Sequence, residues 1–429
     1  MSRQGRALVI GGSVAGLLAA RVAADRFAEV TVFERDRLPD RPEARRGTPQ
    51  AEHTHALLDR GKAILEGLFP GFFADMATYG VAPLDTAADA RWYHRGAWKM
   101  RFPSGYAGYP MSRRLLEWKV RQRVAAIPGV RISDGTPVDS LLATGGRVAG
   151  IRAGGEDVRA DLVIDASGRG SRLPDWLGEL GYPVPPLTKI RVDLGYATRL
   201  YRRPAAPRDW ALAICSGGAR AGYIVPIEGG LWSATLVGYF GDHPPADDPE
   251  FLAFAGSLPV PDIHMALAEA EPLGPAARYR FAAYRWHRYE RLPAFPPGVV
   301  AMGDAVCSFN PAFGQGMTTA AVESEVLAAW LRAGGTSTAA FQRRVAAVVR
   351  DVWLMATFED FRFPETEGAR PRGWPAMQWL MDRFVAASNT DRLAMTRFLQ
   401  VMHMHRRPVR ALADPRVLGT MLLLGEHRP

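Results

Sequence analysis

The stretch Ala7-Leu-Val-Ile-Gly-Gly-Ser-Val-Ala-Gly-Leu-Leu18 decides the fold of this chain of 429 residues. Its first four residues, Ala7 to Ile10, are apolar and suit a buried parallel strand. A glycine-rich turn follows, and Leu17 to Ala24 then has the small and apolar residues of a helix. A strand that enters a helix through such a turn is typical of a dinucleotide site, because the helix begins with free N–H groups and the positive end of its dipole.

The residues after this turn complete a βαβ unit. Val30 to Phe33 predicts the second strand, and Glu34 follows it, 18 residues after Gly16, near the spacing of a carboxylate that binds ribose hydroxyls. Ser13 stands where the usual pattern has its middle glycine, but serine is small and its hydroxyl can bind a phosphate. The cofactor contacts expected here are Gly11, Gly12, Ser13, Val14, Ala15, Gly16, Glu34 and Arg35.

A second segment, almost 300 residues later, has the features of a flavin site. Gly298 to Met302 predicts a strand that runs into Gly303 and Asp304, whose carboxylate can accept hydrogen bonds from a ribityl chain. Gly314-Gln-Gly-Met317 then opens a long helix, Thr318 to Leu331. A helix N-terminus at this point can stabilise the negative charge that a flavin gains on reduction.

Three further motifs complete a family resemblance: Arg46-Gly-Thr-Pro-Gln-Ala-Glu-His-Thr-His-Ala-Leu-Leu58, Ser112-Arg-Arg-Leu-Leu-Glu117 and Asp165-Ala-Ser-Gly-Arg-Gly-Ser-Arg172. With the two glycine-rich segments, they make the chain resemble the FAD-dependent aromatic hydroxylases and epoxidases, which are single-component flavoprotein monooxygenases. Within this superfamily, the chain is most similar to the actinobacterial branch that includes the polyether-antibiotic epoxidases. The resemblance covers residues 5 to about 335.

The resemblance implies FAD as cofactor, NAD(P)H as reductant and molecular oxygen as co-substrate. A flavin C4a-hydroperoxide would then epoxidise or hydroxylate a hydrophobic natural product of secondary metabolism. Further cofactor contacts are implied at Arg46, Gly47, Arg113, Val138, Asp165, Gly303, Asp304, Pro311, Gly314, Gly316 and Met317. Because the cofactor performs the difficult step, no acid or base need be present. The residues expected to line the reaction site are Pro49, Gln50, His53, His55, Pro311 and Phe313.

The implied fold is α/β, with a Rossmann-like FAD-binding domain of the p-hydroxybenzoate hydroxylase type, an inserted antiparallel sheet and a helical tail. We expect residues 1–80, 105–175 and 285–335 to form the FAD-binding domain. Residues 81–104 and 176–284 are expected to form the substrate-binding sheet, since strand-like runs separated by turn residues fill much of 190–238. Residues 247–267 are predicted to be helical, and 336–429 to form the C-terminal helical region.

The composition is that of a globular protein in a reducing cytoplasm. Only two cysteines are present, far apart, so neither a disulfide framework nor a metal site of CxxC type is indicated. No signal peptide or transmembrane run is evident. The net charge is +9, but 49 of the 53 basic residues are arginines that are dispersed along the chain, so we expect no nucleic-acid partner.

The tail is rich in large apolar residues, and two interpretations of it stay open. The favoured interpretation is that these residues pack in the core of the terminal helices. The alternative is that they form an adaptable lining for an extended apolar substrate or a weak peripheral contact with a membrane. The residues concerned are Trp374, Met377, Trp379, Met381, Phe384, Met395, Phe398, Met402 and Met404. Trp92, Tyr93 and Trp98 are likewise expected in the core or in the cavity wall.

Three other functions are compatible with a flavin fold. A halogenase similar to the tryptophan halogenases would carry a Trp-x-Trp-x-Ile-Pro segment and a lysine that takes up hypohalous acid. The sequence has no such segment, and none of its four lysines, Lys62, Lys99, Lys119 and Lys189, stands in a matching context. A prenyl-chain reductase would consume no oxygen during turnover. A flavin-binding scaffold or sensor would not be reduced by a nicotinamide.

Overall fold

A computed structural model describes residues 4–55 and 57–423. Its first part is a five-stranded parallel sheet with the strand order β17-β11-β1-β2-β7. The strands are β1 (Arg6–Ile10), β2 (Glu29–Phe33), β7 (Val130–Ser133), β11 (Leu162–Asp165) and β17 (Val299–Ala301). Apolar side chains bury β1 on both faces, as in other parallel sheets.

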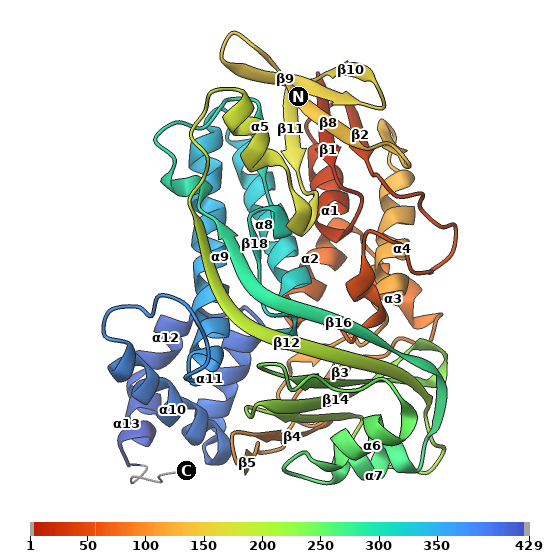
Figure 1. Cartoon of the computed structure of the whole chain (residues 1–429), viewed down its shortest axis with the longest axis vertical. Coiled ribbons are helices and arrows are strands. Elements are labelled where there is room, and N and C mark those ends of the chain that lie inside the picture. Colours follow the sequence, from red (N-terminus) through yellow and green to blue (C-terminus); the bar gives the residue numbers. More distant parts are fainter. Residues whose placement is uncertain (1–3, 56, 424–429) are drawn as a thin grey trace.

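Helices cover this sheet, as Figure 1 shows. α1 (Val14–Ala23) follows β1 directly and packs between α4 (Arg113–Ala125) and α8 (Gly316–Arg332). Smaller helices lie nearby: α2 (Asp59–Leu68), α3 (Phe72–Ala77) and α5 (Leu173–Glu179). A separate antiparallel sheet contains β8 (Val138–Thr144), β9 (Arg147–Ala153) and β10 (Glu156–Arg159). The predicted α/β class and Rossmann-like core are confirmed.

The second part is an eight-stranded sheet with the order β18-β16-β12-β15-β14-β13-β4-β5. It consists of β4 (Ala90–His94), β5 (Ala97–Trp98), β12 (Leu187–Arg202), β13 (Leu212–Ser216), β14 (Arg220–Ile227), β15 (Leu231–Gly238), β16 (Glu271–His287) and β18 (Cys307–Ser308). Two long strands, β12 and β16, curve across the molecule from α8 and α9 to the region of α6 and α7 (Figure 1). A small hairpin pairs β3 (Leu84–Asp85) with β6 (Ala107–Gly108).

Three details of this part differ from the prediction. The sheet is mixed, because β4 pairs with β13 in parallel. β16 was not predicted, since Pro272, Gly274 and Pro275 at its start look like turn residues; the strand accommodates them beside an irregularity in its pairing with β12. The predicted helix at 247–267 is two helices, α6 (Asp248–Gly256) and α7 (Asp262–Ala268), because Pro259 and Pro261 interrupt it.

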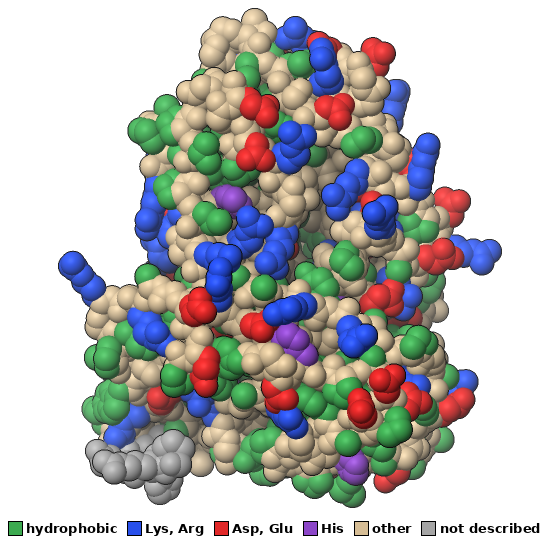
Figure 2. Space-filling view, viewed as in Figure 1, with side chains coloured by type: hydrophobic (Ala, Val, Ile, Leu, Met, Phe, Trp, Pro, Cys, Tyr) green, Lys and Arg blue, Asp and Glu red, His purple; other side chains and the backbone are tan. Residues whose placement is uncertain are grey.

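The C-terminal region is helical, as predicted. α9 (Thr338–Asp360) runs back along α8, and α10 (Trp374–Thr390), α11 (Arg392–Met402), α12 (Pro408–Leu412) and α13 (Pro415–Leu423) form a compact group at one end of the eight-stranded sheet (Figure 1). No helix in residues 4–55 and 57–423 has the length and apolar character needed to cross a membrane. On the face shown in Figure 2, Lys and Arg side chains are spread among Asp and Glu side chains.

Candidate active site

A cavity of about 690 Å³ lies between the two sheets and the C-terminal helices. It begins at the glycine turn after β1 and ends among α9, α10 and α11. It brings together the following residues predicted for the site: Gly11, Ser13, Val14, Ala15, Glu34, Arg35, Arg46, Gly47, Pro49, Gln50, His53, His55, Arg113, Gly303, Asp304, Pro311, Phe313, Gly314, Gly316 and Met317. The two glycine-rich segments thus meet at one cavity.

The glycine turn is shaped for close backbone approach. Gly11 has a φ of +105°, and a Cβ on it would lie 2.4 Å from the carbonyl oxygen of Ala166. A Cβ on Gly16 would lie 1.8 Å from the carbonyl oxygen of Gly11, so only glycine lets α1 pack this close to β1. No side chain caps the N-terminus of α1: the Ser13 hydroxyl donates to Glu117 Oε2 at 2.6 Å and accepts from Arg113 at 3.0 Å. The first N–H groups of α1 are left for an anion.

A buried ion cluster lies at the end of the cavity that the sequence predicts to bind a nucleotide, here called the nucleotide end. Glu34 accepts hydrogen bonds from the N–H groups of Gly12 (2.8 Å) and Asp36 (3.0 Å). Arg45 lies 3.2 Å from Glu34 and donates to Glu117 at 2.9 Å. Burial lowers the pKa of Arg45, but Glu117 and Glu34 outweigh this and raise it above its ordinary value. Sequence reasoning named the exposed Arg46 and missed Arg45, since no pattern distinguishes adjacent arginines.

Arg113 joins the nucleotide end to the histidines. It donates to Ser13 Oγ at 3.0 Å and to His55 Nε2 at 3.2 Å, while its buried Nε has no hydrogen-bond partner among the described residues and lies 3.9 Å from Glu117 Oε2. His55 Nδ1 then donates to the carbonyl oxygen of His53 at 2.8 Å. Burial is the main cause that lowers the pKa of His55 to about 3 and that of His53 to about 4, so both rings are neutral at pH 7. Neither is poised as a general base near neutral pH.

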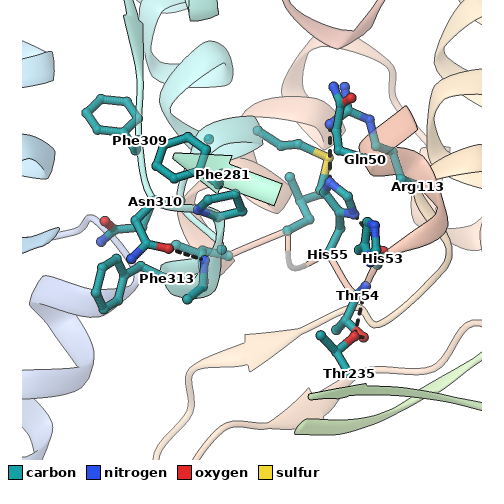
Figure 3. A pocket seen from close by; sticks show the side chains of 18 of the residues that line it. Gln50, His53, Thr54, His55, Arg113, Thr235, Phe281, Phe309, Asn310 and Phe313 are labelled. Carbon is teal, nitrogen blue, oxygen red and sulfur yellow. Dashed lines mark hydrogen bonds between the residues drawn. The ribbon is translucent and has the colours of Figure 1, made fainter. Parts of the chain in front are cut away.

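Figure 3 shows how these side chains face the segment around Asn310, which the sequence predicts to bind a flavin. Gln50, His53, His55 and Arg113 lie on one side of the cavity, and Phe281, Phe309, Asn310 and Phe313 lie on the other. Gln50 belongs to the short helix η1 (Pro49–Glu52), and His53 is held by Thr198 Oγ1 at 2.8 Å from Nδ1. One wall of the space between the two groups consists mainly of aromatic rings, and the other consists of polar side chains. This combination suits a polar heteroaromatic ring.

Asp304 is the acceptor that faces this space. It lies in the turn η5 (Gly303–Ala305), and its side chain is open to the cavity although protein atoms surround it. Within residues 4–55 and 57–423, no hydrogen bond or ion pair occupies its carboxylate. Burial raises the pKa of Asp304, and the charges of Arg113 and Arg169 oppose this effect.

The segment before α8 is fixed from behind by a buried polar network. Asn310 Oδ1 accepts from the N–H of Ala312 and from the Tyr196 hydroxyl, both at 2.9 Å. Asn310 Nδ2 donates to Asp360 at 3.1 Å, and Asp360 also accepts from the Tyr239 hydroxyl at 3.0 Å. The segment η6 (Pro311–Phe313) then reaches Gly314, whose φ is 63°. α8 starts at Gly316 without a side-chain cap, so its first N–H groups face the cavity region.

Some predicted contacts lie outside the cavity lining. Gly12 and Gly16 lie behind it, and Val138 is in β8. Asp165 is fully buried and accepts from the hydroxyls of Ser167 and Ser171, both at 2.5 Å, so it stabilises the turn after β11. Among the described residues, no group of three or more His, Cys, Asp or Glu side chains is arranged to hold a metal ion.

The far end of the cavity is an apolar chamber that includes part of the tail. Met381, Phe384, Phe398 and Met402 line it, whereas the other five tail residues singled out by the sequence do not. Trp92 also lines it, but Tyr93 and Trp98 do not. Sequence reasoning missed three polar residues here, His94, Glu359 and His403, because no motif surrounds them.

The donor and acceptor groups of the near end fit FAD. Two uncapped helix N-termini and the close approach at Gly11 suit a pyrophosphate and the anionic edge of a flavin. The unoccupied acceptor capacity of Asp304 suits ribityl hydroxyls, and the Nε of Arg113, which donates no hydrogen bond to the described residues, suits a phosphate oxygen.

Comparison with known proteins places the chain in a family. No family model matches it. It is 36% identical over 428 residues to protein Rv3254 of Mycobacterium tuberculosis, covering 92% of this chain and 88% of that protein. It is 28% identical over 177 residues to the chloroplastic zeaxanthin epoxidase of Oryza sativa subsp. japonica, which covers 40% of this chain and 26% of that protein.

Solved structures share the fold at low identity. The flavin-dependent brominase Bmp2 has a TM-score of 0.64 and 15% identity, with 97% of each chain covered. PqsL, a probable FAD-dependent monooxygenase from Pseudomonas aeruginosa, has a TM-score of 0.60 and 16% identity, with 83% of this chain and 96% of that chain covered. The chain therefore belongs to the same family as Rv3254, and its fold is that of the flavin-dependent monooxygenases and halogenases.

Proposed function

We propose that this protein is an FAD-dependent monooxygenase that uses NAD(P)H and molecular oxygen to epoxidise or hydroxylate a hydrophobic natural product. One observation carries the proposal: a single cavity begins at two features suited to FAD and continues into an apolar chamber walled by α9, α10 and α11. A redox cofactor and an apolar substrate would thereby meet in one enclosed space.

Bound FAD would supply the activation of oxygen and the transfer of one oxygen atom. The residues of the chain would bind and orient the cofactor and the substrate. Gly11, Arg113 and Asp304 would hold the cofactor, and the segment from Asn310 to Met317 would place helix N–H groups at its ring. The rings and methionines of the chamber would exclude water and hold the substrate. Because His53 and His55 are neutral and hydrogen-bonded within the protein, their role would be to shape the wall.

Epoxidation is the favoured reaction, since it needs only an alkene held near the transferred oxygen and no base. The sequence likeness to polyether-type epoxidases and the partial identity with a zeaxanthin epoxidase support this preference. Hydroxylation of a phenol would call for a base, and the cavity offers no histidine with a pKa near 7 among its described residues. We assign the reaction to secondary metabolism because of the sequence resemblance to the polyether-type epoxidases.

A halogenase is the alternative favoured by the fold of Bmp2. All four lysines lie in the described part of the chain, and none of them lines the cavity, so a lysine that takes up hypohalous acid has no candidate here. A prenyl-chain reductase of the same fold is a further alternative, and its lack of oxygen consumption separates it by experiment.

Stopped-flow absorbance tests the proposal. The FAD-loaded protein is reduced anaerobically with NADPH or NADH and then mixed with oxygen. We expect a transient band that differs from those of oxidised and reduced flavin, and incorporation of one oxygen atom into an added alkene. Stoichiometric bromination of a substrate with bromide present would favour the halogenase. Turnover without oxygen consumption would favour the reductase, and failure of both nicotinamides to reduce the flavin would contradict the proposal and favour a flavin-binding scaffold or sensor.

Replacing Asp304 by alanine is expected to weaken FAD binding by about 10- to 100-fold, because hydrogen bonds to a charged group contribute about 1.5–3 kcal/mol each. Equilibrium dialysis of the apoprotein against FAD measures this. Asp25→Ala is the matched control, since Asp25 is exposed near the far end of α1, where it pairs with Arg21, and lies outside the cavity lining. An Asp304→Ala protein that purifies with full FAD occupancy would remove Asp304 from the cofactor site.

A further inference from the structure

Glu359 is the one carboxylate among the described residues that line the apolar chamber. Met355, Glu359 and Phe363 are spaced four residues apart from α9 onward, and all three line the cavity. The Glu359 side chain is 19% exposed, so part of it is open to the chamber, although apolar side chains of α10 and α11 surround this end. A carboxylate among aromatic rings and methionines is costly to bury unless it is paired and hydrogen-bonded.

Glu359 is held by arginines and keeps acceptor capacity. Arg95 donates to its two oxygens at 2.7 and 3.1 Å, and Arg362 lies 3.6 Å away. Two short hydrogen bonds leave lone pairs on both oxygens, because an ionised carboxylate can accept about four. Burial raises the pKa of Glu359, but Arg95 and His94 outweigh it and hold the carboxylate ionised.

The charges around Glu359 exclude a cationic ligand. Arg95 and Arg362 balance Glu359 and Asp382, which lies 2.6 Å from Arg95. Lys99 also lies close by; burial lowers its pKa to about 7, and its Nζ donates to the carbonyl oxygen of Val385 at 3.1 Å. With the arginine and carboxylate charges balanced, an ammonium group would bring an uncompensated charge into the chamber. A neutral hydrogen-bond donor would not.

His94 offers a second acceptor beside Glu359. The ring is 5% exposed, lines the cavity, and is neutral because burial lowers its pKa to about 4. Its Nε2 lies 3.8 Å from Glu359, and a lone pair facing a carboxylate would be repelled, so we assign the proton to Nε2. Nδ1 is then an acceptor, and it has no partner among the described residues.

From this arrangement we infer that the substrate is a bulky, largely apolar molecule that carries a neutral hydroxyl group, and that Glu359 accepts a hydrogen bond from this hydroxyl next to His94. Glu359 thereby determines specificity and does not take part in oxygen transfer. The inference rests on the proposed function only in that it assigns the chamber to the substrate.

Ligand binding to the FAD-loaded protein tests the inference without reductant or turnover. The probes are naphthalene, 2-naphthol and 2-methoxynaphthalene, measured by isothermal titration. A purely apolar chamber would bind naphthalene at least as well as 2-naphthol, because the hydroxyl must leave water. We expect 2-naphthol to bind about tenfold or more tightly than either of the other two, since a hydrogen bond to a charged acceptor outweighs that loss.

Glu359→Gln is expected to reduce this preference to about threefold or less, because an amide oxygen is a weaker acceptor. Glu290→Gln is the matched control: Glu290 is also largely buried, is paired with Arg288 at 2.6 Å, and lies outside the cavity lining. This control should keep the wild-type preference.

Equal binding of the three probes by the wild-type protein, including no binding of 2-naphthol, would overturn the inference even if Glu359→Gln failed to fold. A wild-type preference that Glu359→Gln retains would overturn the role of Glu359. Both results are independent of whether flavin reduction and oxygen transfer occur, so they are distinct from failure of the proposed function.

Discussion

Replacing Gly16 by alanine is expected to abolish retention of FAD and to lower the free energy of unfolding by more than about 3 kcal/mol. The added Cβ would lie 1.8 Å from the carbonyl oxygen of Gly11 and 3.0 Å from its carbonyl carbon. Both are backbone atoms, so no side-chain rotation relieves the overlap, and α1 must move away from β1. The turn that presents N–H groups to the cofactor moves with it. Flavin absorbance after gel filtration and unfolding in urea measure the two effects.

Gly67→Ala is the matched control for this change. Gly67 lies in α2, and a Cβ there would meet nothing within 4 Å. Alanine has the higher helix propensity, so the control should keep its flavin and be unchanged or up to about 1 kcal/mol more stable. A Gly16→Ala protein with wild-type flavin content and urea midpoint would contradict the close packing of α1 on β1.

Replacing Glu323 by glutamine is expected to make the protein more stable at high pH and to leave it unchanged at low pH. Glu323 is fully surrounded by protein beneath the turn η5 and accepts from the N–H of Gly303 at 2.5 Å. Burial is the main cause that raises its pKa to about 8, and Asp304 adds to this. The folded protein therefore holds a proton that the unfolded chain releases near pH 4.5.

The sign of the pH effect follows from this difference. Stability from the protonated carboxyl group is fully present below about pH 4.5 and is lost as the pH rises through about 8. Over this window the free energy of unfolding of the wild-type protein should fall by about 3 to 5 kcal/mol, because one pKa unit corresponds to about 1.4 kcal/mol. That of Glu323→Gln should not show this fall. Urea unfolding at pH 5 and pH 9 with saturating FAD measures it.

Glu325→Gln is the control on the same helix, since Glu325 is half exposed and pairs with Arg60. This variant should follow the wild-type protein at both pH values. Parallel pH profiles of the wild-type protein and Glu323→Gln would show that Glu323 does not hold its proton in the folded state.

The nucleotide end of the site could be predicted because each of its features is local in sequence. A strand, a glycine turn and a helix within Ala7 to Ala24 leave few alternatives, and the geometry at Gly16 explains why glycine is required. The same holds for Gly303 and Asp304, which follow a buried strand. The ion cluster around Arg45 could not be predicted, because its partners Glu34 and Glu117 are brought together only by packing of distant segments.

The lining of the apolar chamber could not be predicted, because the sequence pattern of apolar residues is the same whether they face a core or a cavity. Met381 and Met395 have similar helical surroundings in the sequence, yet Met381 lines the cavity and Met395 is buried away from its lining. Glu359 is likewise one charged residue among many on helices. Only the packing of α9 beside Arg95, which follows β4, makes Glu359 a carboxylate that opens into the apolar chamber.

The two long strands limit how evolution or an engineer can recombine this chain. β12 and β16 pair along 187–202 and 271–287, and β16 also pairs with β18 directly after the Asp304 turn. A crossover point between residues 202 and 271 would take the two paired strands from different parents. Chimeras that take 187–308 from one parent as a whole should fold, whereas those that divide this block should not accumulate as native protein.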